Sequence, residues 1–186
     1  MKLALQLNNY VWEEGPTGLG AMLAKIAQAA DEHGFSNVAV ADHVWAVPPW
    51  MGPVEGQIPE CYTTLAYLAG HTSRVGLIAL ATPPHFRHPA MLAKMVSTLD
   101  TISGGRAWLG VGAGDYEDEA VGLGMGYPPV GERFEMLEEA VQICLHMWGG
   151  EHGDDQPYQG KHYRLERALN SPQWPKSADR PHPLIM

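Results

Sequence analysis

The chain has 186 residues, a hydrophobic fraction of 45% and a formal net charge of −9. This length allows one domain with a real core, and an acidic balance without a basic cluster argues against nucleic acid as a partner. No apolar run approaches the roughly 18 residues that a membrane span requires. The only cysteines, Cys61 and Cys144, make no disulfide framework and favour a reduced, cytoplasmic setting.

Short apolar runs alternate with amphipathic stretches of helical period along the chain. Gly34 is well placed to end the first helix, and a loop rich in Pro, Gly and Trp over residues 44–59 has the length typical of functional loops. The predicted elements are a strand at 3–7, a helix at 19–33, a strand at 38–41, a helix at 60–71, a strand at 75–81, a helix at 89–102, a strand at 106–111, a helix at 132–148, a strand pair within 158–165 with its turn at 159–160, and a last strand at 183–186.

The stretch from Val75 to Asp115 reads as a βαβ unit, in which two short strands flank one helix. Such a unit implies parallel strands, and ligands then bind beyond the carboxyl ends of those strands. Parallel strands joined by helices form either an open doubly wound sheet or a barrel. A full eight-stranded barrel typically needs about 250 residues. We therefore expect residues 1–186 to be a single domain that forms the first part of a longer α/β design.

Two of the predicted helices carry apolar faces that should pack inward. On the helix at 89–102, the face expected to pack on the sheet comprises Met91, Leu92, Met95 and Leu99. On the helix at 132–148, the apolar face includes Phe134 and Leu145.

Polar and aromatic residues follow the second predicted strand. Asp42 and His43 lie where this strand meets the long loop, and a histidine there can act as a general base or donate to a ring oxygen. The alternative is a histidine that is simply hydrogen-bonded in the barrel mouth. Trp45 and Trp50 could wall a pocket or stack on a flat ligand, or merely cover the top of the barrel.

A second candidate follows the strand at 75–81. His85 and His88 lie three residues apart with Arg87 between them, which raises the question of metal binding. No third ligand is evident, and no HExxH or CxxC pattern occurs, so we predict no metal site. The alternative is that Arg87 and His88 tie the loop to the helix at 89–102.

The glycines at the end of the strand at 106–111 suggest close contact with a flat ring. Residues 110–114 lack the last glycine of a dinucleotide fingerprint, and Asp115 follows at once, where it would repel a pyrophosphate. The acidic residues beyond are typical of a solvated helix start. A second interpretation has Asp115 or Glu117 facing the site as an acid or base.

Several segments resemble the luciferase-like monooxygenase superfamily, and more closely its branch of deazaflavin-dependent oxidoreductases. The segments are ADH at 41–43, YTTLAYLAGHTSRVGLIALAT at 62–82, FRHPAMLAKMVSTLDTISGGRAWLGVGAG at 86–114, PPVGERFEMLEEAVQICLHMW at 128–148 and YxGKHYRLE at 158–166, followed by SPQ and RPHPLIM. The resemblance covers nearly the whole chain.

The resemblance implies a (β/α)8 TIM-barrel type of fold, here truncated to about five βα units, and a homodimer. It implies a tricyclic ring at the C-terminal mouth, either the deazaflavin coenzyme F-420 (F420) or FMN. The reaction would be hydride transfer between the ring and a small organic molecule. His43, preceded by Asp42, matches the family's histidine near the reacting face.

The resemblance also assigns cofactor contacts. Ala79 and Leu80 match the family's non-prolyl cis peptide behind the ring, and Thr82 could bond the ring's pyrimidine edge. Gly112 and Ala113 match the strand end beneath the ring. Together these positions are expected to form one rim with His43.

Two departures from the family pattern carry consequences. Some relatives have a glutamate acid where this chain has Ala113, so His43, Asp115 or water would have to serve. The family's phosphate-binding loop follows the fifth strand, just where this sequence stops, so an isolated chain of this length is expected to hold the cofactor weakly or not at all.

Three hypotheses therefore stand at the level of sequence. The first is an F-420-dependent oxidoreductase, and the second is an FMN-dependent monooxygenase of the same superfamily. The third is a truncated, non-catalytic half-barrel.

Overall fold

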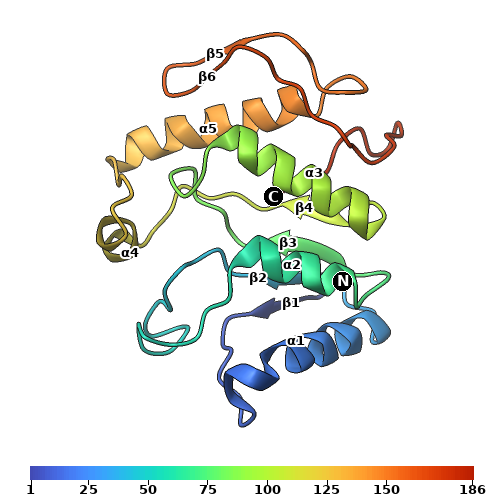
Figure 1. The fold of residues 1–186 in the computed structure, drawn as a ribbon, viewed down its shortest axis with the longest axis vertical. Coiled ribbons are helices and arrows are strands. Elements are labelled where there is room, and N and C mark those ends of the chain that lie inside the picture. The colour runs from blue at the N-terminus through green and yellow to red at the C-terminus, as the bar shows by residue number, and fades with distance from the viewer. The chain divides into compact units, whose positions relative to one another are not determined.

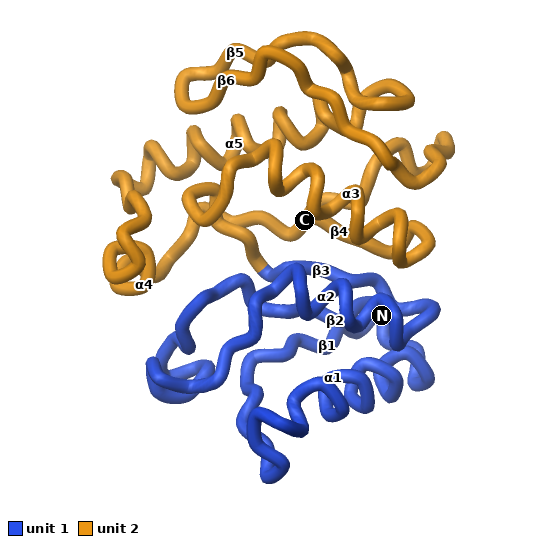
Figure 2. Tube along the Cα trace, viewed as in Figure 1, with its two compact units in different colours: residues 1–80 blue, residues 81–186 orange.

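A computed structural model describes all 186 residues of the chain. The architecture is mixed α/β, with parallel strands joined by helices, as the sequence predicts (Figure 1). The chain divides into two compact units, residues 1–80 and residues 81–186 (Figure 2). The single domain expected over residues 1–186 stays a prediction. None of the helices is long and apolar enough to cross a membrane.

The first unit is a three-stranded parallel sheet with two helices. Strand β2 pairs with β1 on one side and with β3 on the other, so Val40 lies between Leu7 and Ala79. Burial of all four β2 residues fits a central parallel strand. The elements are β1 (Ala4–Leu7), α1 (Gly15–Glu32), β2 (Asn37–Val40), α2 (Cys61–Ala69) and β3 (Gly76–Ala79).

Helix α1 begins earlier than the sequence pattern predicts. It starts at Gly15, ahead of the apolar period, because Pro16 fits the first turn, where the missing N–H has no helical partner. It ends at the expected place: Gly34 follows the C-cap with a φ of +78°, and Phe35 N donates to Ala30 O at 3.0 Å. A glycine is favoured there because other residues rarely adopt this left-handed conformation.

A buried carboxylate connects the end of α1 to the start of β3. Asp31 accepts hydrogen bonds from the backbone N–H groups of Ser73, Arg74 and Val75 at 3.1, 2.7 and 2.7 Å. Burial raises the pKa of Asp31, but these hydrogen bonds outweigh burial and hold the pKa below its ordinary value. The contact fixes where the chain enters β3.

The second unit contains a parallel strand pair, three helices and a small hairpin. Strand β4 pairs with β7, with Leu109 opposite Ile185, and α3 packs on both α5 and β4. Trp148 is buried, and its Nε1 donates to Ala93 O at 3.1 Å, which joins the end of α5 to α3. The elements are α3 (Pro89–Ser103), β4 (Ala107–Leu109), α4 (Glu117–Gly122), α5 (Val130–Met147), β5 (Tyr158–Gln159), β6 (Arg164–Leu165) and β7 (Leu184–Ile185).

The predicted helix faces are partly wrong. Leu92 and Leu99 are buried as expected, but Met91 is 57% exposed. The helical period directs Met91 away from the inner face of α3, and Val96 is buried on that face instead. On α5, Phe134 and Leu145 are exposed, and the buried face instead includes Arg133 and Ile143.

The antiparallel pair of β5 and β6 confirms the predicted strand pair, but the turn is longer than expected. Residues 160–163 form the connection instead of a tight turn at 159–160. The reason is Glu139 on α5, whose carboxylate accepts from the backbone N–H groups of Lys161, His162 and Tyr163 at 2.7, 3.0 and 3.0 Å. The connection is thereby wrapped around a side chain from the helix.

Asp100 holds three parts of the second unit together. This residue of α3 is 2% exposed, and its Oδ1 accepts from Ala107 N, the first residue of β4, at 3.0 Å. Arg180, from the segment before β7, donates to both carboxylate oxygens at 2.8 and 2.5 Å. The pair therefore ties the approach to β7 onto the α3–β4 connection.

We expect Asp100→Asn to lower the free energy of unfolding by about 3 kcal/mol, since breaking one partner of a buried ion pair leaves the other charge uncompensated. Urea unfolding followed by circular dichroism measures the change. Asp179→Asn, at an exposed neighbour of Arg180, is the matched control and should change stability by less than about 0.5 kcal/mol. Equal effects of the two variants would contradict the role given to Asp100.

We expect Glu139→Gln to destabilise the chain by about 1–2 kcal/mol at pH 7, because a neutral amide accepts hydrogen bonds less strongly than a carboxylate. Burial raises the pKa of Glu139, but the three backbone N–H donors outweigh it and lower the pKa. The stabilisation is therefore present above the ordinary glutamate pKa and is lost as the pH falls through the lowered value. Urea unfolding gives the free energy of unfolding of Glu139→Gln and of wild type, and the difference between them should be smaller at pH 3 than at pH 7. The control Glu138→Gln should have the stability of wild type at both pH values.

Candidate functional site

Three polar side chains and one leucine follow the strands at the carboxyl edge of the sheet in the first unit. Asn8 follows β1, Asp42 and His43 follow β2, and Leu80 follows β3. Because the strands are parallel and in register, these ends share one edge. Asp42 is 3% exposed and His43 is half-buried. This edge therefore carries a half-buried histidine next in sequence to a buried carboxylate.

Asn8 is a member of this edge that sequence reasoning missed. Its Oδ1 is buried and has no hydrogen-bond partner. A buried acceptor without a donor costs free energy, so this oxygen suits a ligand with an N–H or O–H group. The sequence feature that could have revealed Asn8 is its position directly after the first predicted strand.

The prediction of a cis peptide bond between Ala79 and Leu80 is wrong. The cis bonds of the chain are Pro48–Pro49 and Ser171–Pro172, so the Ala79–Leu80 bond is trans. Leu80 N donates to Val40 O at 2.8 Å and simply extends the parallel ladder. A non-prolyl cis bond costs roughly 3–4 kcal/mol, and the regular end of β3 does not impose it.

The two tryptophans of the long loop differ in exposure. Trp45 is half-buried, whereas Trp50 is 77% exposed. Their assignment to a substrate pocket stays a prediction.

At the start of the second unit, Thr82 and Gly112 are joined by backbone hydrogen bonds. Thr82 is 1% exposed; its N–H donates to Gly110 O, and its carbonyl accepts from Gly112 N, both at 3.0 Å. A Cβ at Gly112 would lie 3.4 Å from the Ala81 Cβ. Ala113, the next residue, is half-buried, whereas Asp115 is exposed.

Arg133 fixes the backbone beyond β4, and sequence reasoning missed it. This residue of α5 is 8% exposed and donates to the carbonyls of Ala113, Gly114 and Pro128 at 3.0, 3.3 and 2.7 Å. Its guanidinium lies 4.0 Å from the centre of the Tyr127 ring, a cation–π contact. The sequence feature that could have revealed Arg133 is a charged residue at a position whose helical neighbours are apolar.

His85 packs directly against the end of this segment. A Cβ at Gly114 would lie 2.5 Å from His85 Cε1, so only glycine leaves room for the ring. The imidazole makes edge-to-face contacts with Phe86 and Tyr127. Burial, and then the nearby charge of Arg133, lower the pKa of His85. The protonated form of the ring is therefore disfavoured, although the charge of Glu119 acts in the opposite direction.

His88 has the structural role that the sequence allowed for it. Its Nδ1 accepts from Ala90 N at 3.2 Å, which caps the start of α3. No group of three or more His, Cys, Asp or Glu side chains could hold a metal ion.

Each unit carries groups that fit a flat heteroaromatic ring. In the first unit, the unpartnered Asn8 Oδ1 can accept from a ring N–H, and His43 offers a titratable nitrogen. In the second unit, Gly112 has no side chain to obstruct a planar group, and Thr82 contributes a buried hydroxyl. The donor set thus suits a deazaflavin or flavin ring.

Comparison with known proteins agrees with this chemistry. An F420-dependent glucose-6-phosphate dehydrogenase from Nakamurella multipartita is 36% identical over 147 residues, which is 78% of this chain and 41% of that protein. Another, from Kineococcus radiotolerans, is 35% identical with the same coverage. The chain therefore spans about two fifths of the length of these curated relatives.

Solved structures show where this architecture occurs. The monooxygenase RslO1 from Streptomyces bottropensis matches all of this chain and 52% of its own, with a TM-score of 0.79 and 29% identity. An F420-dependent secondary alcohol dehydrogenase in complex with an F420–acetone adduct matches 90% of this chain and 47% of its own, with a TM-score of 0.71; at 22% identity this likeness shows the fold alone. The fold is thus a partial TIM-type barrel, as predicted.

The family model for luciferase-like monooxygenases matches residues 8–186. This match spans both units of the chain and includes Asp42, His43, Thr82 and Gly112. The chain therefore belongs to the luciferase-like monooxygenase family.

Proposed function

We propose that the chain forms part of the barrel of an F420-dependent oxidoreductase, which transfers a hydride between the deazaflavin and a small organic substrate. The observation that carries the proposal is the 36% identity, over 78% of the chain, to an enzyme named as F420-dependent. The chemistry of the strand ends supports it, because a histidine, a buried hydroxyl and open glycine backbone suit a redox ring. When bound, the deazaflavin supplies the carbon that accepts or gives the hydride.

His43 is the residue we assign to proton transfer. The relatives are named as dehydrogenases of a sugar phosphate, so the proposed substrate carries a hydroxyl on the carbon that is oxidised. His43 would accept the hydroxyl proton as that carbon gives up hydride, and it would donate the proton in the reverse reaction. Asp42, which is buried and precedes His43 in the chain, would orient the site, and Asp115 is the alternative acid or base.

The remaining predicted residues would hold the ring. Thr82, Gly112 and Ala113 would contact it from the second unit, whereas the role given to Ala79 and Leu80 is not proposed, because it depended on a cis bond that is trans. Trp45 and Trp50 would wall the substrate side. Among the residues that the sequence did not suggest, Asn8 would accept from a ring N–H and Arg133 would keep the Ala113–Gly114 backbone in place.

An FMN-dependent monooxygenase is the second candidate. RslO1, at 29% identity, is a monooxygenase, and a 3,6-diketocamphane monooxygenase component from Pseudomonas putida, in complex with FMN, shares the fold with a TM-score of 0.69 at 23% identity, covering 96% of this chain and 45% of its own. In either case we propose a homodimer in the cytoplasm. Neither cysteine forms a disulfide and both are buried, which suits a reducing compartment.

Cofactor titration tests the proposal. We expect F420 to bind the purified chain more tightly than FMN, because the relatives at 35–36% identity are named for F420. Fluorescence of each cofactor, followed as protein is added, measures the two dissociation constants. Tighter binding of FMN would favour the monooxygenase, and no saturable binding of either would leave the non-catalytic half-barrel.

We expect His43→Ala to slow hydride transfer to F420 by about 10²–10⁴-fold, the usual contribution of a general acid or base. The rate is followed as the loss of oxidised F420 in single-turnover mixtures with glucose 6-phosphate and simple secondary alcohols. F420 binding and the circular dichroism spectrum should remain close to wild type. His33→Ala, at an exposed histidine of the first unit, is the control, and an unchanged rate in His43→Ala would remove His43 from the chemistry.

A further inference from the structure

The 83–88 loop connects Thr82 to the start of α3 and packs against the end of β4. Thr82 O, just before the loop, accepts from Gly112 N at 3.0 Å. A Cβ at Gly114 would lie 2.5 Å from His85 Cε1, so the imidazole of this loop lies directly on the backbone of residue 114. The conformation of the loop therefore bears on the strand end that the proposed function assigns to the ring.

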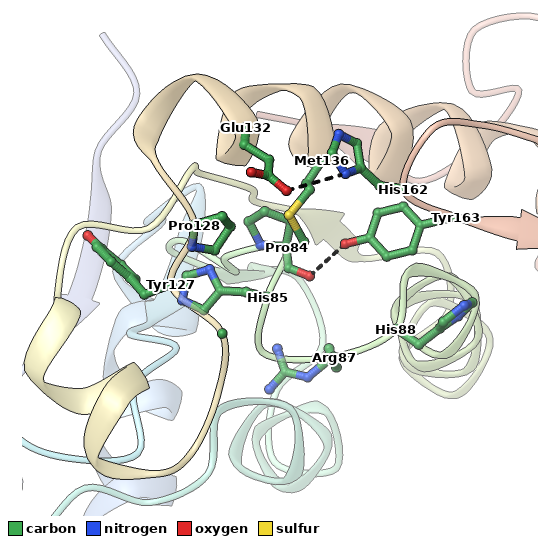
Figure 3. Close-up of a pocket in the computed structure, with 11 residues that line it drawn as sticks. Pro84, His85, Arg87, His88, Tyr127, Pro128, Glu132, Met136, His162 and Tyr163 are labelled. Atoms are coloured by element: carbon green, nitrogen blue, oxygen red, sulfur yellow. Dashed lines mark hydrogen bonds and ion pairs between the residues drawn. The ribbon is translucent and has the colours of Figure 1, made fainter.

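The 83–88 loop and the tip of the β5–β6 hairpin, residues 160–163, line the same pocket of about 730 Å³ (Figure 3). Tyr163 joins the two walls. Its hydroxyl donates to Pro84 O at 3.1 Å, and its ring makes an edge-to-face contact with the imidazole of His88, with the ring centres 5.7 Å apart. A single side chain of the hairpin thus contacts both the beginning and the end of the loop.

The Tyr163 hydroxyl is well suited to this contact. Burial, and then the charge of Glu139, raise the pKa of Tyr163, so the phenol keeps its proton at neutral pH and can donate. Pro84 is buried, and a buried carbonyl that loses its donor costs free energy. The hydrogen bond therefore favours one position of the Pro84 carbonyl, which precedes His85 in the chain.

Tyr163 can act as a support because the hairpin tip is itself fixed to α5. The carboxylate of Glu139 accepts from the backbone N–H groups of residues 161–163 at 2.7, 3.0 and 3.0 Å. Glu135, one turn earlier on the helix, accepts from Lys161 Nζ at 2.6 Å. The position of the Tyr163 side chain is therefore determined by α5.

Helix α5 also holds the end of β4 directly. Arg133 donates to the carbonyls of Ala113 and Gly114 at 3.0 and 3.3 Å. The second connection runs from α5 through the hairpin tip, Tyr163 and the 83–88 loop to His85, which packs on the same glycine. The strand end is thus supported from two directions by one helix.

We propose that Tyr163 is a positioning residue for the cofactor. By holding the Pro84 carbonyl, Tyr163 keeps the 83–88 loop, and through it Thr82 and the end of β4, in the arrangement that receives the ring. This inference rests on the proposed function, which assigns Thr82, Gly112 and Ala113 to the ring. Tyr163 acts through the loop, because its hydroxyl hydrogen is bonded to Pro84 O.

Tyr163→Phe tests the proposal, with Tyr158→Phe as the matched control. Both variants remove one hydroxyl from the same hairpin. The Tyr158 hydroxyl donates to Gln142 Oε1 of α5 at 2.8 Å, a bond that does not reach the 83–88 loop. A difference between the two variants therefore reports on the contact with Pro84.

Amide hydrogen exchange of the cofactor-free chain, followed by NMR, is the first measurement. The N–H groups of Thr82 and Gly112 bond to the backbone across the strand end, and they should exchange about fivefold faster in Tyr163→Phe, the effect of losing one hydrogen bond. In Tyr158→Phe their rates should stay within about twofold of wild type. The amide of Trp148, which bonds to Cys144 O at the far end of α5, should be unaffected in both variants, which separates a local effect from a general loss of stability.

Fluorescence titration with F420 is the second measurement. The dissociation constant should rise about fivefold in Tyr163→Phe and by less than about twofold in Tyr158→Phe. Glu139→Gln loosens the hairpin tip without contacting the loop, so it should also weaken F420 binding. Added to Tyr163→Phe, it should weaken binding by less than about twofold further, because both changes act through one contact.

Exchange of Thr82 and Gly112 at the wild-type rate in Tyr163→Phe would overturn the proposal, as would an equal acceleration at Trp148. So would a wild-type affinity for F420 in Tyr163→Phe. If F420 binds neither wild type nor variants, the proposed function fails together with the role of Tyr163 toward the cofactor. The exchange rates still decide, in that case, whether Tyr163 holds the strand end.

Discussion

The buried carboxylate of Asp100 is the contact on which the second unit depends. It lies in α3, accepts from the first backbone N–H of β4, and receives both guanidinium nitrogens of Arg180. The segment over residues 166–183 has almost no regular structure of its own. Its approach to β7 is therefore set by a side-chain contact, and the pairing of β7 with β4 follows from that contact.

The same physical device recurs along the chain. Asp31 near the end of α1 accepts from the backbone before β3, Asp100 near the end of α3 accepts from the start of β4, and Glu139 of α5 accepts from the hairpin tip. In each case a carboxylate on a helix satisfies N–H groups that no strand or helix partner reaches. Three acidic side chains thus fix the positions of connecting segments outside their own helices. The apolar core stabilises the packing of the helices and strands themselves.

Hydrophobic periodicity revealed the strands and helices because burial of one face dominates their energetics. The same reasoning singled out Asp42 and His43 as candidates, since polar groups that follow parallel strands lie at the carboxyl edge of their sheet. Sequence reasoning failed where a single tertiary contact decides whether a residue is buried. Arg133 is buried because three carbonyls satisfy it, and nothing local in the sequence shows those carbonyls. The Ala79–Leu80 peptide was assigned by family resemblance, and no residue pattern could have corrected it.

The close contact between Gly114 and His85 has a consequence for how such a protein can change. Any side chain at position 114 would displace the imidazole, which in turn contacts Tyr127 and so the ring on which Arg133 rests. The backbone at Gly114 and the contact between Tyr127 and Arg133 are therefore coupled through the packing of His85. A change at position 114 would disturb both, so these two parts of the second unit should change together among descendants of this chain.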